Sequence, residues 1–192
     1  MIYVTSFGAK IPDDAIEINC TSKSKSWDKA LSPFFLGPVD LYMGLTSVNF
    51  ENGWQFAKTY SQHVNSNGNP TQKYWDWAKK GWADSWAHRY PMGRGAIPEY
   101  SLWEGEKLGY IEARKKIYIP LYSSTVKEIY AFRHLEAVAL KAKEDGKDLY
   151  IKDYDGYNHK RIGMTYDDVI NCESRKMGHG FCLAMLLDKE LS

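Results

Sequence analysis

The chain has 192 residues and a formal net charge of +1, from 25 Lys and Arg against 24 Asp and Glu, and 44% of its residues are hydrophobic. These values exclude an intrinsically disordered chain, a coiled coil and a strongly basic DNA-coating protein. The length predicts a single domain over 1–192, and nucleic-acid binding would require a local patch.

Hydrophobic spacing and turn residues predict an α+β protein that is mostly helical, with a few short strands. In chain order, we expect strands at 2–6 and 15–21, an irregular or edge segment at 31–44, and a helix at 48–62 capped by Ser47. A second helix runs from Thr71 into the high 80s with a break at Gly81, and a third runs from Ser101 until Pro120 ends it. A helix at 125–144, a strand at 148–154 and an apolar helix at 178–191 follow.

The cysteines Cys20, Cys172 and Cys182 form no CxxC pair, and their odd number predicts reduced thiols in a cytoplasmic protein. No apolar run approaches the ~20 residues of a membrane span, so we expect no membrane partner. The five histidines show no HxxxH or HExxH spacing. The sequence therefore predicts no metal and no cofactor.

The expected helix at 48–62 carries a polar stripe. Helical spacing places Glu51, Gln55, Lys58 and Gln62 on one side, opposite an apolar face. A carboxylate, an amide and a cation on one stripe suit a catalytic site, whereas a solvated helix face with a Glu51–Gln55 or Gln55–Lys58 contact is the structural alternative.

A Trp- and Lys-rich segment covers 70–95. Aromatic rings that alternate with cations are typical of sites for single-stranded or flipped bases, because rings stack on bases and cations contact phosphates. An amphipathic helix that packs its Trp side on the core explains the pattern equally well. The cations of this segment are Lys73, Lys79, Lys80, Arg89 and Arg94.

The segment 153–159 begins at the end of the expected strand at 148–154. A carboxylate and an amide at a strand end, Asp155 and Asn158, can point into a cleft. A simple Asp-Gly turn is the alternative.

Together, these motifs resemble the NADAR family of N-glycosidases, which act on nucleotides and on ADP-ribosylated guanine. The family motif E-H-x-x-Q-x-x-K is similar to Glu51, Gln55 and Lys58, with Trp54 at its aromatic position. Asn52 stands where the family has His. Further similarities, in chain order, are Gly93-Arg94, a long helix headed by Trp103, the pair Asp155 and Tyr157, and the helix from Gly178.

The resemblance implies a NADAR-like fold and an N-glycosidase that cleaves a C1′–N bond. We expect Glu51 to stabilise the positive charge on the sugar and Asp155 to act as the second acid. The expected substrate-binding residues are Asn49, Trp54, Gln55, Lys58, Arg94, Trp103, Tyr157 and Asn158. Lys73, Lys79, Lys80 and Arg89 would bind nucleic acid.

The departures from the family favour a base within DNA as the substrate. The expected activity is a DNA glycosylase in antiphage defence against glucosylated hydroxymethylcytosine DNA, and its target nucleotide would be flipped out of the duplex. One alternative is a NADAR-type hydrolase of ADP-ribosylated guanine or free nucleotides. The other is a non-enzymatic nucleic-acid binding module.

Overall fold

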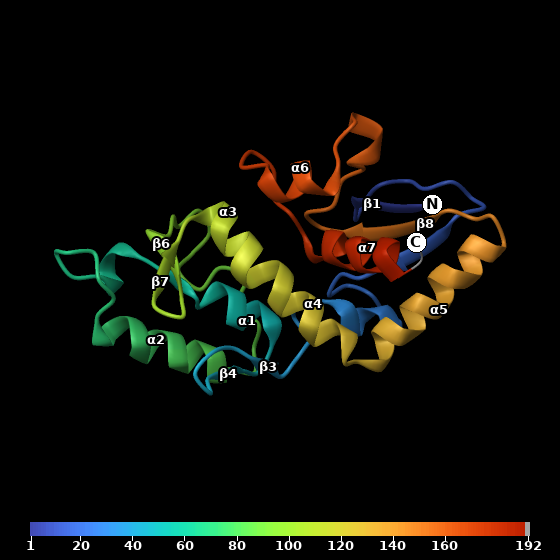
Figure 1. Ribbon diagram of the computed structural model, residues 1–192. Coiled ribbons are helices and arrows are strands. Elements are labelled where there is room, and N and C mark those ends of the chain that lie inside the picture. The colour runs from blue at the N-terminus through green and yellow to red at the C-terminus, as the bar shows by residue number, and fades with distance from the viewer. Residues whose placement is uncertain (191–192) are drawn as a thin grey trace. The chain divides into compact units, whose positions relative to one another are not determined.

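A computed structural model describes residues 1–190 as an α+β protein in which helices predominate and the strands are short, as predicted (Figure 1). The chain divides into two compact units. Unit 1 consists of Met1–Ser32 and Tyr122–Ser192, and unit 2 consists of Pro33–Leu121. The boundary falls inside helix α4, Ile119–Lys127. That 1–192 forms one domain stays a prediction.

Unit 1 is built on a three-stranded parallel sheet with the order β1–β8–β2 (Ile2–Ser6, Leu149–Asp153 and Ile16–Asn19). The central strand thus comes from the C-terminal half of the chain. Its alternating residues Leu149, Ile151 and Asp153 are buried. Ile151 pairs in register with Val4 and Ile18, so one buried row crosses all three strands.

Three helices accompany this sheet: α5 (Tyr130–Glu144), α6 (Tyr166–Asn171) and α7 (His179–Glu190). Figure 1 shows α7 beside β1 and β8. Phe181, Leu183 and Leu187 are fully buried in α7, as expected for a helix that is apolar on most of its surface. Single 3₁₀ turns lie at Trp27–Leu31 and Lys160–Ile162.

Unit 2 holds two small antiparallel sheets and the helices α1 and α2. Strands β3 (Val39–Asp40) and β4 (Thr46–Ser47) form one pair, and β5 (Lys58–Thr59), β6 (Tyr100–Trp103) and β7 (Glu106–Leu108) form the other sheet. Helix α1 spans Phe50–Gln55 and α2 spans Gln72–Ala83. A 3₁₀ turn at Ser61–His63 lies between β5 and α2.

Helix α2 packs on an aromatic core of unit 2. Tyr74, Ala78 and Trp82 of this helix contact Phe56 and Leu102. The helix passes Gly81 without the predicted break. A Cβ at Gly81 would lie 2.0 Å from the Phe56 ring, so the glycine makes room for this ring rather than ending the helix.

The predicted helix at 48–62 is wrong in its extent and its cap. Asn49, not Ser47, caps α1, because its side chain accepts a hydrogen bond from the backbone N–H of Asn52. The helix stops at Gln55, and Lys58 and Thr59 instead pair with β6. Pairing with a strand some forty residues away overrides the helical spacing.

The predicted helix at 101–120 is wrong in its first part and in its end, whereas 110–120 is helical. Its first part is the hairpin β6–β7, whose turn residues Glu104 and Gly105 both have positive φ. Helix α3 (Tyr110–Ala113) and a π-helical turn (Arg114–Tyr118) then lead directly into α4. Pro120 is the second residue of α4 and follows the π-helical turn directly, and the helical run continues through it to Lys127. The predicted helix at 125–144 begins later, at Tyr130.

Cys20, Cys172 and Cys182 are free thiols, and the predicted helix end at Leu191 lies outside the described residues. Within residues 1–190, none of the helices has the length and apolar character that crossing a bilayer requires.

Candidate functional site

A chain of hydrogen-bonded side chains links Glu51, Gln55 and Lys58 in unit 2. Gln55 Nε2 donates to Glu51 Oε1 at 2.9 Å, and Lys58 Nζ donates to Gln55 Oε1 at 2.7 Å. Glu51 is 7% exposed and Gln55 is 9% exposed, so the carboxylate and the amide lie inside the protein rather than on a solvated face. We call these three residues the Glu51 array.

Aromatic rings border the Glu51 array. Lys58 Nζ lies 4.9 Å from the centre of the Trp54 ring, close enough for a cation–π contact. Tyr118 packs edge-on against Trp54 and Phe50, with ring centres 5.1 and 5.2 Å apart. A carboxylate and a cation of the Glu51 array therefore lie beside the apolar ring of Trp54, all within helix α1 and the strand after it.

Asn49 and Asn52 serve the fold. Asn49 caps α1. Asn52 is fully buried, and its amide donates to the carbonyls of Asp84 and Trp86 at 2.9 Å each. Its Oδ1 accepts from the backbone N–H of His88 at 2.8 Å. The residue that departs from the family motif thus ties the chain after α2 to α1.

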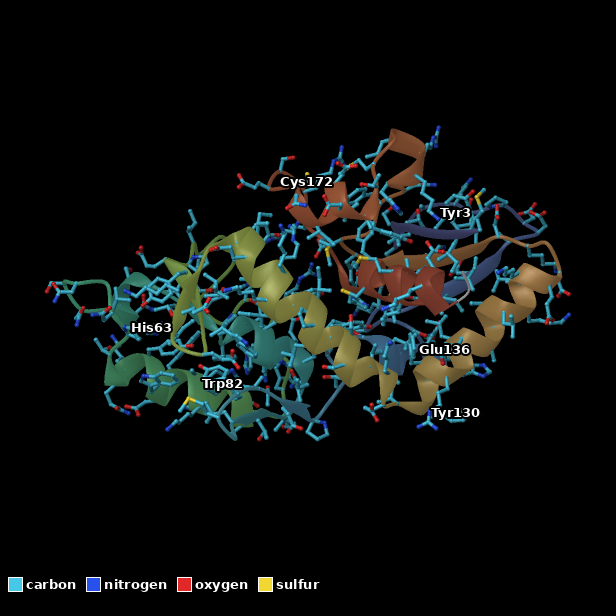
Figure 2. All side chains as sticks on the ribbon, in the orientation of Figure 1. Tyr3, His63, Trp82, Tyr130, Glu136 and Cys172 are labelled. Carbon is cyan, nitrogen blue, oxygen red and sulfur yellow. The ribbon has the colours of Figure 1, made fainter. Side chains whose placement is uncertain are left out.

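In the segment 70–95, most Trp side chains pack against the core, whereas the lysines lie on the surface. Trp82, labelled in Figure 2, lies near the end of α2 and is 2% exposed. Trp75 and Trp77 pack against the same core. Trp86 is the exception, with 75% of its surface exposed. Lys73, Lys79 and Lys80 are exposed on α2, which makes α2 the amphipathic helix of the structural alternative and leaves its cations on the surface.

Three further predicted residues of unit 2 lie outside the Glu51 array. Arg94 is exposed in a turn between two glycines with positive φ, and Arg89 stacks over Tyr90 at 5.6 Å. Trp103 lies on β6, not at the head of a helix, and packs edge-on against Tyr42.

Asp155, Tyr157 and Asn158 belong to unit 1, where they follow β8 as predicted. Asp155 is half-buried. Tyr157 packs on Phe181 with ring centres 4.8 Å apart, and Asn158 Oδ1 accepts from the backbone N–H of Arg161 at 3.0 Å. Glu51 and Asp155 thus belong to different units.

Unit 1 also contains a buried cluster that the sequence analysis missed. Ligand atoms of Cys20, Asp153 and His179 lie within 4.8 Å of one another. The three residues are 0%, 3% and 6% exposed. Spacing could not reveal them, since they come from two strand ends and a helix start far apart in the sequence.

A hollow of about 380 Å³ opens at the end of α2, lined by Lys79, Trp82 and Val48 among others. None of the Glu51 array lines it. It is therefore a separate feature beside the exposed lysines.

No protein-family model matches the chain, and the comparisons with curated proteins and with solved structures find no significant match.

Proposed function

We propose that the protein is an N-glycosidase that removes a modified base from DNA, with Glu51 as the carboxylate that stabilises the transition state. The observation that carries the proposal is the Glu51 array, in which a buried carboxylate accepts from the Gln55 amide and that amide accepts from Lys58, beside the Trp54 ring. Cleavage of a C1′–N bond creates positive charge on the sugar, and a fixed carboxylate in a poorly solvated site stabilises that charge strongly.

The other members of the array have complementary roles in this proposal. Gln55 holds the Glu51 carboxylate through its N–H group, which keeps one carboxylate oxygen in a fixed orientation. Lys58 places a positive charge beside the Trp54 ring, where a stacked base and its phosphate would be bound together. The role of Asp155 as a second acid stays a prediction.

Exposed lysines on α2 support DNA rather than a free nucleotide as the substrate. A net charge of +1 provides little long-range attraction for DNA, so a local patch such as Lys73, Lys79 and Lys80 must supply it. The exposed Trp86 ring follows this patch in the chain.

Release of the base tests the proposal. The protein is incubated with DNA that contains glucosylated hydroxymethylcytosine, with unmodified DNA, and with free and ADP-ribosylated nucleotides, and the released base is identified by mass spectrometry. We expect release from the modified DNA. Release only from nucleotides would favour the NADAR-type hydrolase, and DNA binding without release would favour the non-enzymatic module.

The salt dependence of DNA binding provides a second test. Each phosphate contact contributes about −0.9 to the slope of log K against log salt for duplex DNA. Replacing Lys79 and Lys80 together by Ala should therefore flatten the slope by up to about two units. The matched control replaces the exposed Lys23 and Lys25 of unit 1 and should leave the slope unchanged. A wild-type slope near zero would contradict the DNA proposal.

A further inference from the structure

The carboxyl ends of the parallel strands in unit 1 bring together three residues that can bind a metal ion. Asp153 ends β8, Cys20 directly follows β2, and His179 begins α7. This edge is where open parallel sheets place their ligand sites, because the chain turns away there and leaves side chains converging.

The hydrogen bonds of His179 determine which ring nitrogen is available. Its Nε2 lies 2.7 Å from the backbone carbonyl of Cys20. A carbonyl oxygen can only accept, so Nε2 carries the proton of this bond and a neutral ring has its lone pair on Nδ1. Metal-binding histidines almost always have such a bond on their other nitrogen, because it fixes the tautomer and the direction of the ring.

The free lone pair of that neutral ring faces a carboxylate. His179 Nδ1 lies 3.3 Å from Asp153 Oδ2. Two acceptors at this distance repel each other unless a proton or a metal ion lies between them. The separation is close to the edge of a tetrahedral zinc site, which is about 3.4 Å for nitrogen and oxygen ligands.

The third ligand, the thiol of Cys20, favours a metal ion over a proton. Cys20 is completely buried, and its thiol donates to the backbone carbonyl of Lys152 at 3.1 Å, a proton that it would release on binding a metal ion as thiolate. Since all three ligand atoms lie within 4.8 Å of one another, binding would draw them inward by about 1 Å. A sulfur, a nitrogen and an oxygen ligand form a set that Zn²⁺ accepts, whereas Mg²⁺ and Ca²⁺ prefer oxygen alone.

Backbone packing keeps the carboxylate of Asp153 in place. Its Oδ2 also accepts from the N–H of Gly180 at 2.8 Å. A Cβ at Gly178 would lie 2.0 Å from the same oxygen, so only glycine leaves room for it. The ligand is therefore oriented from the N-terminus of α7 before an ion arrives.

We propose that Cys20, Asp153 and His179 form a zinc-type metal site in unit 1, whose ion stabilises the folded state because it binds only there. Three protein ligands leave the fourth position of a tetrahedral ion open to water, unlike the closed structural sites with four protein ligands. The site is independent of the proposed glycosidase, because its members lie outside the Glu51 array. It would, however, anchor the end of β8 two residues before Asp155.

Metal titration of the full chain tests this proposal. The protein is stripped with a chelator under reducing conditions and titrated with Co²⁺, then with Zn²⁺ in competition. We expect one equivalent of Co²⁺ with a thiolate-to-cobalt charge-transfer band, and displacement of Co²⁺ by Zn²⁺. Zn²⁺ at 100 times its Kd should raise Tm by about 5–10 °C.

Variants locate the bound ion. Cys20→Ser, Asp153→Asn and His179→Gln should lose the band, with folding checked by circular dichroism. Cys182→Ser, at an equally buried thiol outside the cluster, should retain it. Loss of the ion from this control would overturn the proposal. So would a wild-type spectrum without the charge-transfer band, a result that requires no variant to fold.

Discussion

The two units hold their buried polar groups in different ways. In unit 2, the Glu51 array lies within eight residues of chain, and its hydrogen bonds connect neighbouring turns and the strand after them. In unit 1, Cys20, Asp153 and His179 meet only because β8 inserts between β1 and β2 and α7 follows its end. The geometry of the Glu51 array depends on α1 and the strand after it, whereas the geometry of the cluster in unit 1 depends on the fold of the whole unit.

The largest effect on stability is expected at Asn52 in unit 2. Asn52→Ala would remove three hydrogen bonds made by a fully buried amide, and each such bond contributes about 0.5–1.5 kcal/mol. We expect a loss of about 3 kcal/mol or more, measured by urea unfolding followed by tryptophan fluorescence. Six of the seven tryptophans lie in unit 2, so this signal reports mainly on that unit.

Asn69→Ala, also in unit 2, is the matched control for this change. The Asn69 side-chain oxygen accepts one exposed hydrogen bond, from Lys107 Nζ, so its loss should change stability by about 0.5 kcal/mol or less. An equal effect of both substitutions would show that Asn52 does not hold the chain after α2.

In unit 1, Gly178→Ala should be the next most damaging change. The new Cβ would displace the Asp153 carboxylate, and overpacking of this kind costs about 1–3 kcal/mol. The control is Gly8→Ala, where nothing lies within 4 Å of the added Cβ. Thermal unfolding measured by calorimetry compares the two, and a Gly178→Ala protein as stable as the control would contradict the packing argument.

The smallest effect is a loss of stability in mild acid that both units share. Burial lowers the pKa of His63, and Lys73 adds to the shift. Burial likewise lowers the pKa of His159, where Lys160 acts in the same direction and Asp188 against it. The unfolded chain therefore binds these protons first as the pH falls below about 6.5, so the free energy of unfolding decreases there.

Urea unfolding at several pH values measures this effect. We expect stability to fall between about pH 7 and pH 5, by at most about 1.4 kcal/mol per pH unit for each proton. His63→Gln should reduce the slope reported by tryptophan fluorescence. An unchanged slope would show that His63 does not titrate in this range.

The same contrast between local and distant contacts explains what the sequence could predict. The strand at 2–6, the α5 face around Phe132 and Leu135, and the buried α7 were predictable because their signals are local. The pairing of Lys58 with β6 and the hairpin at 100–108 depend on distant partners and turn conformations, so helical spacing gave the wrong result.

The candidate sites follow the same division. Glu51, Gln55 and Lys58 come together as their spacing suggested, although Lys58 lies on a strand. The cluster around His179 carried no spacing signal at all. The one local feature in the sequence is a pair of glycines, Gly178 and Gly180, on either side of His179 at the start of an apolar helix.

In the proposed mechanism, the Glu51 carboxylate stabilises the positive charge that develops on the sugar. Glu51→Gln keeps the shape of the side chain and removes its charge, and the rate of base release from modified DNA is then compared with wild type at equal Tm. We expect a loss of about 10²–10³-fold, the usual effect of removing one electrostatic contact to a transition state. A Glu51→Gln protein that releases base at the wild-type rate would contradict the account.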